Sequence, residues 1–159
     1  MQLNIQEIIK VKSKDEIIKT KNLEIYKADS SEELSLPYIG GVRAGFPSPA
    51  NDFSGERIDI YKECVPHPES TYFARVTGDS MNKDFLEGDL LIIDASLEYR
   101  DNQIAMIYID GEYTMKRIKK TNGKCFLLPS NDSFPLIEIT PESNSQILGI
   151  ITWSFRKHI

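Results

Sequence analysis

The sequence has few of the residues on which metal sites, disulfide scaffolds and histidine-based active sites depend. Its 159 residues include only two cysteines, Cys64 and Cys125, and two histidines, His67 and His158. The cysteines lie far apart and form no CxxC or Cys/His spacing, which favours reduced thiols over a disulfide or a metal site. His67 stands between two prolines, and neither histidine has an obvious relay around it. We therefore expect no metal, no cofactor and no catalytic histidine.

Long apolar runs and an excess of positive charge are also missing. No stretch reaches the roughly 18 apolar residues that a membrane-spanning helix needs. Residues 1–16 scatter charges among apolar residues, unlike a secretory signal, so the cytoplasm is the expected location. The 19 basic and 24 acidic residues give a formal net charge of −5, whereas a protein that grips nucleic acid by itself usually carries a basic surface. Direct DNA binding is therefore not expected, and any link to DNA would run through protein partners.

Glycine and proline are absent from residues 1–36, which are rich in lysine, glutamate, isoleucine and serine. Within this segment, residues 6–19 could form a short helix and Leu23–Lys27 a strand, while the polar run Asp29–Glu33 is typical of a solvated linker. We interpret the segment as a flexible or loosely docked N-terminal arm. The rest of the chain is long enough for one domain with a real core.

The composition changes after residue 36. Glycines and prolines cluster between Pro37 and Pro49, which favours extended or looping backbone. Short runs rich in isoleucine, valine, tyrosine and phenylalanine follow, and they predict a mostly β domain. Asp110-Gly111 separates two of these runs and predicts a two-residue hairpin, because glycine tolerates a positive φ. The predicted strands are Arg57–Tyr61, Thr71–Thr77, Asp89–Asp94, Gln103–Ile109, Glu112–Ile118, Lys124–Pro129 and Ile147–Trp153.

One predicted turn carries a candidate nucleophile. The sequence Gly78-Asp79-Ser80-Met81 follows a predicted strand, so Ser80 is expected in an accessible turn. Backbone N–H groups beside a serine in such a turn can bind an oxyanion. By itself, a Gly-Asp-Ser sequence is more often only a turn.

A candidate base lies on the second strand of the predicted hairpin. A period of two places Thr114, Lys116 and Ile118 on one face of that strand. Strand lysines usually point to water, but an inward face would bury Lys116 among apolar neighbours. A serine hydroxyl needs a base to take its proton, and burial can lower the pKa of a lysine from about 10.4 by several units. Ser80 and Lys116 could therefore form a Ser–Lys dyad, which requires no histidine.

The third candidate element is a peptide bond in the glycine- and proline-rich segment. Ala44 and Gly45 are small, so an extended backbone at this point can approach a nucleophile closely. Val42 could anchor the segment in an apolar pocket, and the surrounding glycines and prolines would let it fold back into a cleft. An Ala-Gly pair in a loop has little meaning when it is taken alone.

Together and in this order, these elements resemble the UmuD/LexA family of self-cleaving peptidases, and most closely its UmuD branch. The resemblance runs from about Leu36 to about Trp153. It rests on several spaced motifs: Gly45-Phe-Pro-Ser-Pro-Ala, Arg57-Ile-Asp, His67-Pro, Thr71-Tyr-Phe, Gly78-Asp-Ser-Met, Gly88-Asp-Leu-Leu-Ile-Ile-Asp and Asp110-Gly-Glu-Tyr-Thr-Met-Lys.

The resemblance implies a mostly β fold, with the curved β-sheet of a LexA/signal-peptidase-type peptidase domain and an extended N-terminal arm. Residues 1–44 would be the arm that self-cleavage removes, and residues 45–159 the Ser–Lys peptidase domain. The implied nucleophile, general base, oxyanion hole and cleaved bond are Ser80, Lys116, the backbone N–H groups of Asp79 and Ser80, and Ala44–Gly45.

The resemblance also implies partners and a pathway. Members of the family form homodimers, and a RecA filament on single-stranded DNA stimulates their self-cleavage in the SOS response. The shortened product then joins a UmuC-type Y-family polymerase for error-prone translesion synthesis.

Two departures from the UmuD pattern keep alternatives open. The segment after Ser80 is one residue shorter, and the arm before Ala44 is longer. The longer arm raises the possibility of a LexA-like or phage-type repressor inactivated by self-cleavage, although residues 1–36 show no two-helix pattern with a basic recognition helix. A dimeric polymerase-binding module with little peptidase activity is a further alternative, and a signal-peptidase-like enzyme is disfavoured because no membrane anchor is present.

Overall fold

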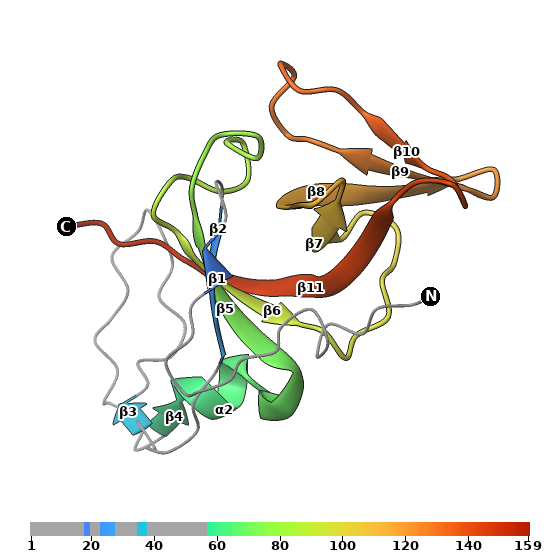
Figure 1. Ribbon diagram of the computed structural model, residues 1–159. Coiled ribbons are helices and arrows are strands. Elements are labelled where there is room, and N and C mark those ends of the chain that lie inside the picture. The colour runs from blue at the N-terminus through green and yellow to red at the C-terminus, as the bar shows by residue number, and fades with distance from the viewer. Residues whose placement is uncertain (1–17, 20–22, 28–34, 38–56) are drawn as a thin grey trace, which may run out of the picture.

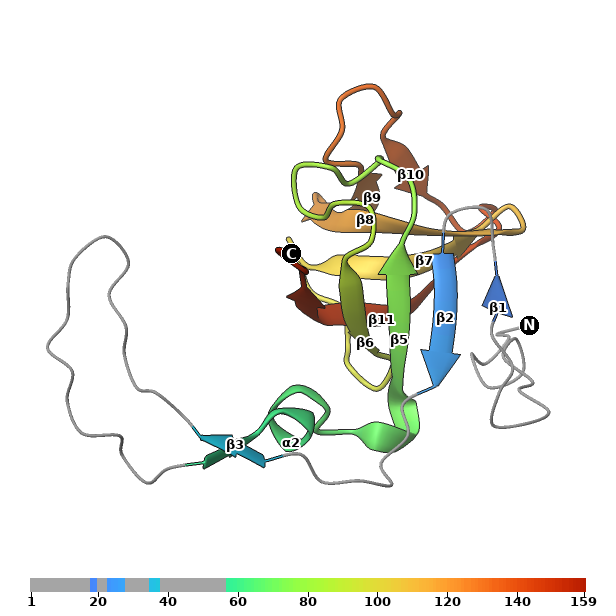
Figure 2. The same cartoon turned by 90° about the vertical axis from the view of Figure 1, so that its left-hand side faces the viewer.

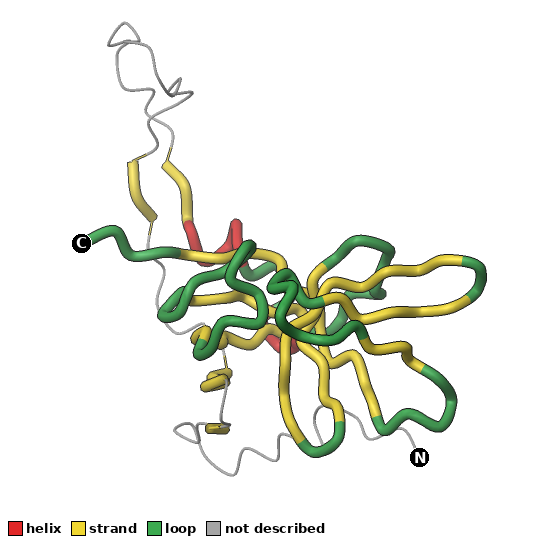
Figure 3. Tube along the Cα trace, turned by 90° about the horizontal axis from the view of Figure 1, so that it is seen from above, coloured by secondary structure: helices red, strands yellow, loops and turns green. Residues whose placement is uncertain are grey.

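The computed structural model describes residues 18–19, 23–27, 35–37 and 57–159, and strands make up most of this part of the chain (Figure 1). All helical segments of the described residues lie between β4 and β5, and they are red in Figure 3. The elements are β1 (Ile18–Lys19), β2 (Leu23–Lys27), β3 (Ser35–Pro37), β4 (Arg57–Asp59), α2 (Ile60–Cys64), the 3-10 turn η1 (Pro68–Ser70), β5 (Thr71–Val76), β6 (Leu90–Asp94), β7 (Ile104–Ile109), β8 (Glu112–Thr121), β9 (Lys124–Leu128), β10 (Ile137–Ile139) and β11 (Ser145–Phe155).

Nine of the strands form one antiparallel sheet in the order β1-β2-β5-β6-β11-β7-β8-β9-β10, and β3 pairs separately with β4. The mostly β prediction is therefore confirmed. β2, β5 and β6 run in a clearly different direction from β7 and β8, which shows that the sheet is strongly curved (Figure 2). No helix among these described segments is long and apolar enough to cross a membrane.

The long strand β11 joins the two halves of the sheet. Its first part pairs with β7 and its last part with β6, and the register shifts twice, between Ile147 and Gly149 and again between Ile151 and Trp153. Bulges of this kind bend a strand and increase its twist. Gly149 lies at the first of them, where an added Cβ would come within 2.8 Å of Ile93 Cγ2. The absence of a side chain at this position therefore lets β6 and β11 approach closely where the sheet bends.

The curved sheet buries apolar side chains on both of its faces. One cluster draws on β5, β6, β7, β8, β11 and the segment after β5: Tyr72, Ala74, Val76, Met81, Phe85, Leu91, Ile93, Met106, Tyr113, Met115 and Leu148. A second cluster lies on the other face of the half formed by β7, β8, β9 and β11: Ala105, Ile107, Ile118, Leu127 and Ile150. On β8 the clusters alternate, because Tyr113 and Met115 belong to the first and Ile118 belongs to the second. The predicted division of this strand into two faces is confirmed.

Most of the predicted strands are observed within a few residues of their expected ends, but the first is wrong in its second half. β4 ends at Asp59, where the side chain caps α2 by accepting hydrogen bonds from the backbone N–H groups of Tyr61 and Lys62. Aspartate at this position satisfies N–H groups that would otherwise lack a partner at the helix start. The predicted strand continued through Ile60 and Tyr61, which instead begin α2.

The described part of the predicted arm is also β. Leu23–Lys27 forms a strand as predicted, and it pairs with β5 in the main sheet. The predicted helix over residues 6–19 is wrong at Ile18–Lys19, which form β1 and pair with β2, and the rest of it lies outside the described residues. The Asp110-Gly111 hairpin is confirmed: both residues have positive φ, 49° and 89°, and they join β7 to β8.

Candidate active site

Ser80 lies in the segment that follows β5, where the chain leaves the sheet before it returns as β6. Gly78 has a φ of 89°, a left-handed conformation that side-chain-bearing residues rarely adopt. Met81 anchors the segment because its side chain is buried, and its carbonyl accepts hydrogen bonds from the N–H groups of Asp84 and Phe85. Ser80 itself is half-buried. The segment thus presents the hydroxyl at the surface of a fixed turn.

Lys116 comes to this turn from the middle of β8. Its Cα pairs across the sheet with Ala105 on β7, and only 5% of the residue is exposed. Its Nζ lies 3.3 Å from Ser80 Oγ, although the two residues are 36 positions apart in the sequence. The structure therefore brings together the two side chains that the sequence singled out.

The surroundings of Lys116 Nζ fix the direction of its lone pair when the amine is neutral. Nζ donates to Thr114 Oγ1 at 2.9 Å and to the Met115 carbonyl at 3.0 Å. A neutral amine has two N–H groups and one lone pair, so these two acceptors use both protons. The remaining position faces Ser80 Oγ, whose O–H can then donate to Nζ. Neither the Thr114 contact nor the Met115 contact was foreseen from the sequence.

Burial lowers the pKa of Lys116 below its ordinary value. No carboxylate among the described residues forms an ion pair with Nζ. A nearby carboxylate would stabilise the ammonium and raise the pKa. Desolvation without such a partner favours the neutral amine, which is the form that can accept a proton.

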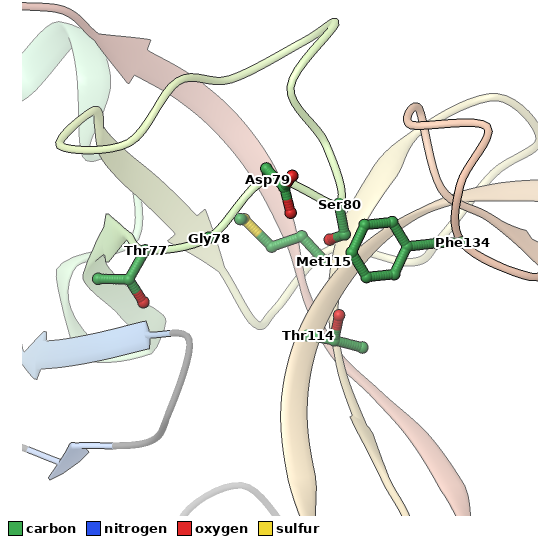
Figure 4. Close-up of a pocket in the computed structure, with 7 residues that line it drawn as sticks. All are labelled: Thr77, Gly78, Asp79, Ser80, Thr114, Met115 and Phe134. Carbon is green, nitrogen blue, oxygen red and sulfur yellow. The ribbon is translucent and has the colours of Figure 1, made fainter.

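A small pocket opens beside the dyad. It is lined by Thr77, Gly78, Asp79, Ser80, Thr114, Met115 and Phe134. Figure 4 shows the Ser80 hydroxyl beside the ring of Phe134, with the side chain of Thr114 below them. The volume is about 80 Å³, far below the roughly 300 Å³ at which pockets for small-molecule ligands begin. Such a space suits a small side chain of a peptide that lies across the turn.

The loop between β9 and β10 reaches back to the turn that carries Ser80. The N–H groups of Ser130 and Asn131 both donate to the Ser80 carbonyl at 3.1 Å, and Asn131 Nδ2 donates to the Asp79 carbonyl at the same distance. Sequence reasoning missed this loop. Its signal was a cluster of turn residues, Ser-Asn-Asp-Ser, which predicts a loop but not where that loop lies.

The backbone N–H groups proposed for the oxyanion hole belong to Asp79 and Ser80. Among the described residues, neither group donates to a backbone carbonyl. Both residues line the pocket. The predicted cleavage bond, Ala44–Gly45, lies outside the described residues.

His67 has a partner that the sequence did not suggest. Its Nδ1 lies 2.6 Å from Oδ2 of the buried Asp94, whose Oδ1 also accepts from Ser96. This cluster lies at the start of β5 and the end of β6, which are the ends remote from the Ser80 turn. It therefore belongs to the packing of η1 on the sheet and not to the dyad. The residues that the structure describes contain no group of three or more histidines, cysteines or carboxylates arranged to hold a metal ion.

Comparison with known proteins finds matches that cover most of the chain. Residues 37–152 match the family model described as Peptidase S24-like. Protein MucA of Salmonella typhimurium is 35% identical over 140 residues, covering 86% of this chain and 95% of MucA. Protein SamA of Salmonella typhimurium strain LT2 is 38% identical, covering 69% of this chain and 76% of SamA. The LexA repressor of Paracidovorax citrulli is 33% identical, covering 74% of this chain but 53% of the repressor.

Proposed function

Because this chain belongs to the Peptidase S24-like family, as a serine peptidase of its UmuD-like, self-cleaving branch, we propose that Ser80 is the nucleophile and Lys116 the general base. The observation that carries the proposal is the 3.3 Å approach of Ser80 Oγ to a buried amine. That amine has two acceptors for its protons and no ion-pair partner among the described residues. This environment supports a neutral lysine, as a Ser–Lys dyad requires.

The proposed substrate is the bond between Ala44 and Gly45 of the chain itself. Ser80 Oγ attacks the Ala44 carbonyl carbon while Lys116 Nζ takes the hydroxyl proton. The carbonyl oxygen becomes an oxyanion, to which the N–H groups of Asp79 and Ser80 donate. Lys116 then returns the proton to the Gly45 nitrogen as the peptide bond breaks, which leaves residues 1–44 esterified to Ser80.

Water completes the reaction. Lys116, neutral again, takes a proton from a water molecule whose oxygen attacks the ester carbon, and the returning proton releases Ser80 Oγ. The products are residues 1–44 and residues 45–159. The pocket of about 80 Å³ supports a small residue on the acyl side of the cut, where Ala44 would lie.

In the proposed biological role, self-cleavage produces a processed subunit for error-prone translesion synthesis in the SOS response. The support is the near full-length match to MucA, with matches to SamA and ImpA over about three quarters of their lengths. In this role the chain works in the cytoplasm as a homodimer, a RecA filament on single-stranded DNA stimulates the cut, and the product binds a UmuC-type Y-family polymerase.

The repressor alternative has weaker support, since the match to the LexA repressor spans only 53% of that protein. An operator-binding assay with the full chain separates the two roles. A third role, as a polymerase-binding module with little peptidase activity, predicts an intact chain even in the presence of activated RecA filament.

The cleavage proposal is tested by incubating the purified chain at mildly alkaline pH and measuring intact mass and N-terminal sequence. We expect a new N-terminus at Gly45, and its loss in Ser80→Ala and Lys116→Ala. Lys119→Ala is the matched control, because Lys119 is a half-exposed lysine of the same strand that contacts Asp101 and not Ser80. Continued cleavage in either dyad variant would contradict the assignment.

A further inference from the structure

Two consecutive carbonyls of the Ser80 turn are held by one residue of a distant loop. Asn131 donates its backbone N–H to the Ser80 carbonyl and its side-chain Nδ2–H to the Asp79 carbonyl, both at 3.1 Å. The residue is 52 positions away from Asp79 in the sequence. Its two contacts are therefore made by tertiary structure and not by the local geometry of the turn.

Holding a carbonyl also fixes the N–H group of the same peptide unit. In a planar trans peptide the C=O and N–H bonds point in opposite directions, and the described residues contain no cis peptide bond. Because the Asp79 carbonyl points to Asn131, the N–H of Ser80 points away from Asn131. This N–H is one of the two donors of the proposed oxyanion hole.

The orientation of the Asn131 amide is itself fixed. Its Oδ1 accepts a hydrogen bond from the backbone N–H of Ser133 at 3.0 Å, an arrangement typical of an Asx turn. This leaves Nδ2 as the end that meets the Asp79 carbonyl. Asn131 is half-buried, and both ends of its side chain are used.

We infer that Asn131 is a positioning residue for the oxyanion hole, whose side-chain amide orients the Asp79–Ser80 peptide so that the Ser80 N–H meets the carbonyl oxygen under attack. The inference rests on the proposed function, because it requires Ser80 to attack a carbonyl. Asn131 acts through the peptide and does not reach the reacting atoms. The Asp79 carbonyl also accepts from the N–H of Asn82 at 3.1 Å, so loss of the amide loosens the peptide without freeing it.

Two substitutions separate this role from a general effect on the loop. Asn131→Asp keeps an oxygen for the Ser133 N–H but has no donor for the Asp79 carbonyl, whereas Asn131→Ala removes both contacts without adding charge. Both should lower the self-cleavage rate of the full chain at the high-pH plateau by about 10- to 100-fold, the cost of a misplaced oxyanion donor. Because Lys116 is untouched, the pH midpoint should stay in place in Asn131→Ala.

The matched control is the neighbouring Asp132→Asn. It removes the exposed pair between Asp132 and Lys83, which tethers the same loop without touching either carbonyl. This variant should cleave at the parent rate. A plateau in Asn131→Ala within about twofold of the parent would overturn the inference, since removal of an oxyanion donor costs far more. So would a loss matched by Asp132→Asn, which would indicate loop stability alone.

A second readout keeps this inference distinct from the proposed function. A small fluorophosphonate reacts with a nucleophilic serine and needs the same oxyanion donors, but it does not need the Ala44–Gly45 bond. If the parent is labelled at Ser80 without cutting itself, the proposed substrate is wrong, and slower labelling in Asn131→Ala still supports the positioning role. Equal labelling rates in the two proteins would overturn it. A parent that is neither cut nor labelled would contradict both proposals.

Discussion

Thr114 and Lys116, two residues apart on β8, are joined through their side chains, with Lys116 Nζ 2.9 Å from Thr114 Oγ1. Strand alternation puts both on the same face, so the bond is a direct consequence of the strand. Together with the Met115 carbonyl it directs the amine toward Ser80. The base is therefore oriented by its own strand, and its partner by the turn after β5.

Thr114→Val should lower the self-cleavage rate at the high-pH plateau by about tenfold, a fraction of the contribution of a well-placed general base. Valine keeps the shape of threonine but removes the acceptor, so the amine can rotate away from Ser80. Thr114→Ser restores an acceptor and should cleave nearly at the parent rate. The time course of intact mass measures all three. A slow Thr114→Ser variant would indicate that the methyl group, and not the hydroxyl, is what matters.

The rate of self-cleavage should rise with pH and level off below the ordinary lysine pKa of about 10.4. Burial lowers the pKa of Lys116, so the neutral, proton-accepting form becomes abundant at a lower pH than it would for an exposed lysine. First-order rates of the full chain over a pH series give the midpoint. A midpoint at or above the ordinary value would show that Nζ is not desolvated when it reacts.

The same burial should make Lys116 costly to stability at neutral pH. The folded chain has the lower pKa, so between the two pKa values the unfolded chain binds more protons, and the free energy of unfolding rises with pH across that window. Lys116→Met should therefore be more stable than the parent near neutral pH, and the difference should shrink as pH rises toward about 10.4. Urea unfolding in a Ser80→Ala background, which prevents self-cleavage, measures it.

Lys119→Met is the control for this comparison, because Lys119 is half-exposed on the same strand. The effect of Lys119→Met on the free energy of unfolding should be small, and it should not change over the same pH range. A difference between Lys116→Met and its parent that stays constant with pH would mean that packing, and not ionisation, sets the cost.

Much of the site could be predicted because it depends on alternation and turns. The period of two on β8 places Lys116 beside Ile118 on a buried face, and Asp110-Gly111 sets the register of the hairpin that carries it. The Ser80 turn follows a strand that the sequence marks clearly. The 3.3 Å contact between the two side chains is a tertiary fact, and only the order of several motifs pointed to it.

The rest could not be predicted, because it depends on where loops and strands meet. Ser130 and Asn131 look like ordinary turn residues, and nothing local indicates that their N–H groups reach the Ser80 carbonyl. The sequence indicates only that Asp94 ends an apolar strand. Its hydrogen bond with His67 forms because η1 folds over that strand. Gly149 sits in a predicted strand, where a single glycine indicates a bulge or a close approach but not which.

Gly149→Ala should destabilise the chain by about 1–3 kcal/mol, the usual cost of an overpacked core position. The added Cβ would lie 2.8 Å from Ile93 Cγ2 and 3.1 Å from the Asp94 carbonyl oxygen. A double-mutant cycle with Ile93→Ala tests the cause, because that change removes the nearest atom and should make the second substitution less costly. Thermal unfolding in the Ser80→Ala background gives the four free energies, and strict additivity would contradict the contact.

The size of the pocket should limit the residue on the acyl side of the cut. Ala44→Leu should slow self-cleavage by at least about tenfold, since a misplaced scissile bond loses the orientation on which the rate depends. Phe134 forms one wall of the pocket and is partly exposed. Phe134→Ala should therefore enlarge the space and restore part of the rate to the Ala44→Leu chain.

This pair of substitutions is informative because the two effects have opposite signs. In the parent background, Phe134→Ala should only slow the cut, since it removes a wall and adds nothing that Ala44 can use. In the Ala44→Leu background it should speed the cut. Rates for the four chains come from one time course of intact mass at a fixed alkaline pH. If Phe134→Ala slows both backgrounds equally, residue 44 does not occupy this pocket.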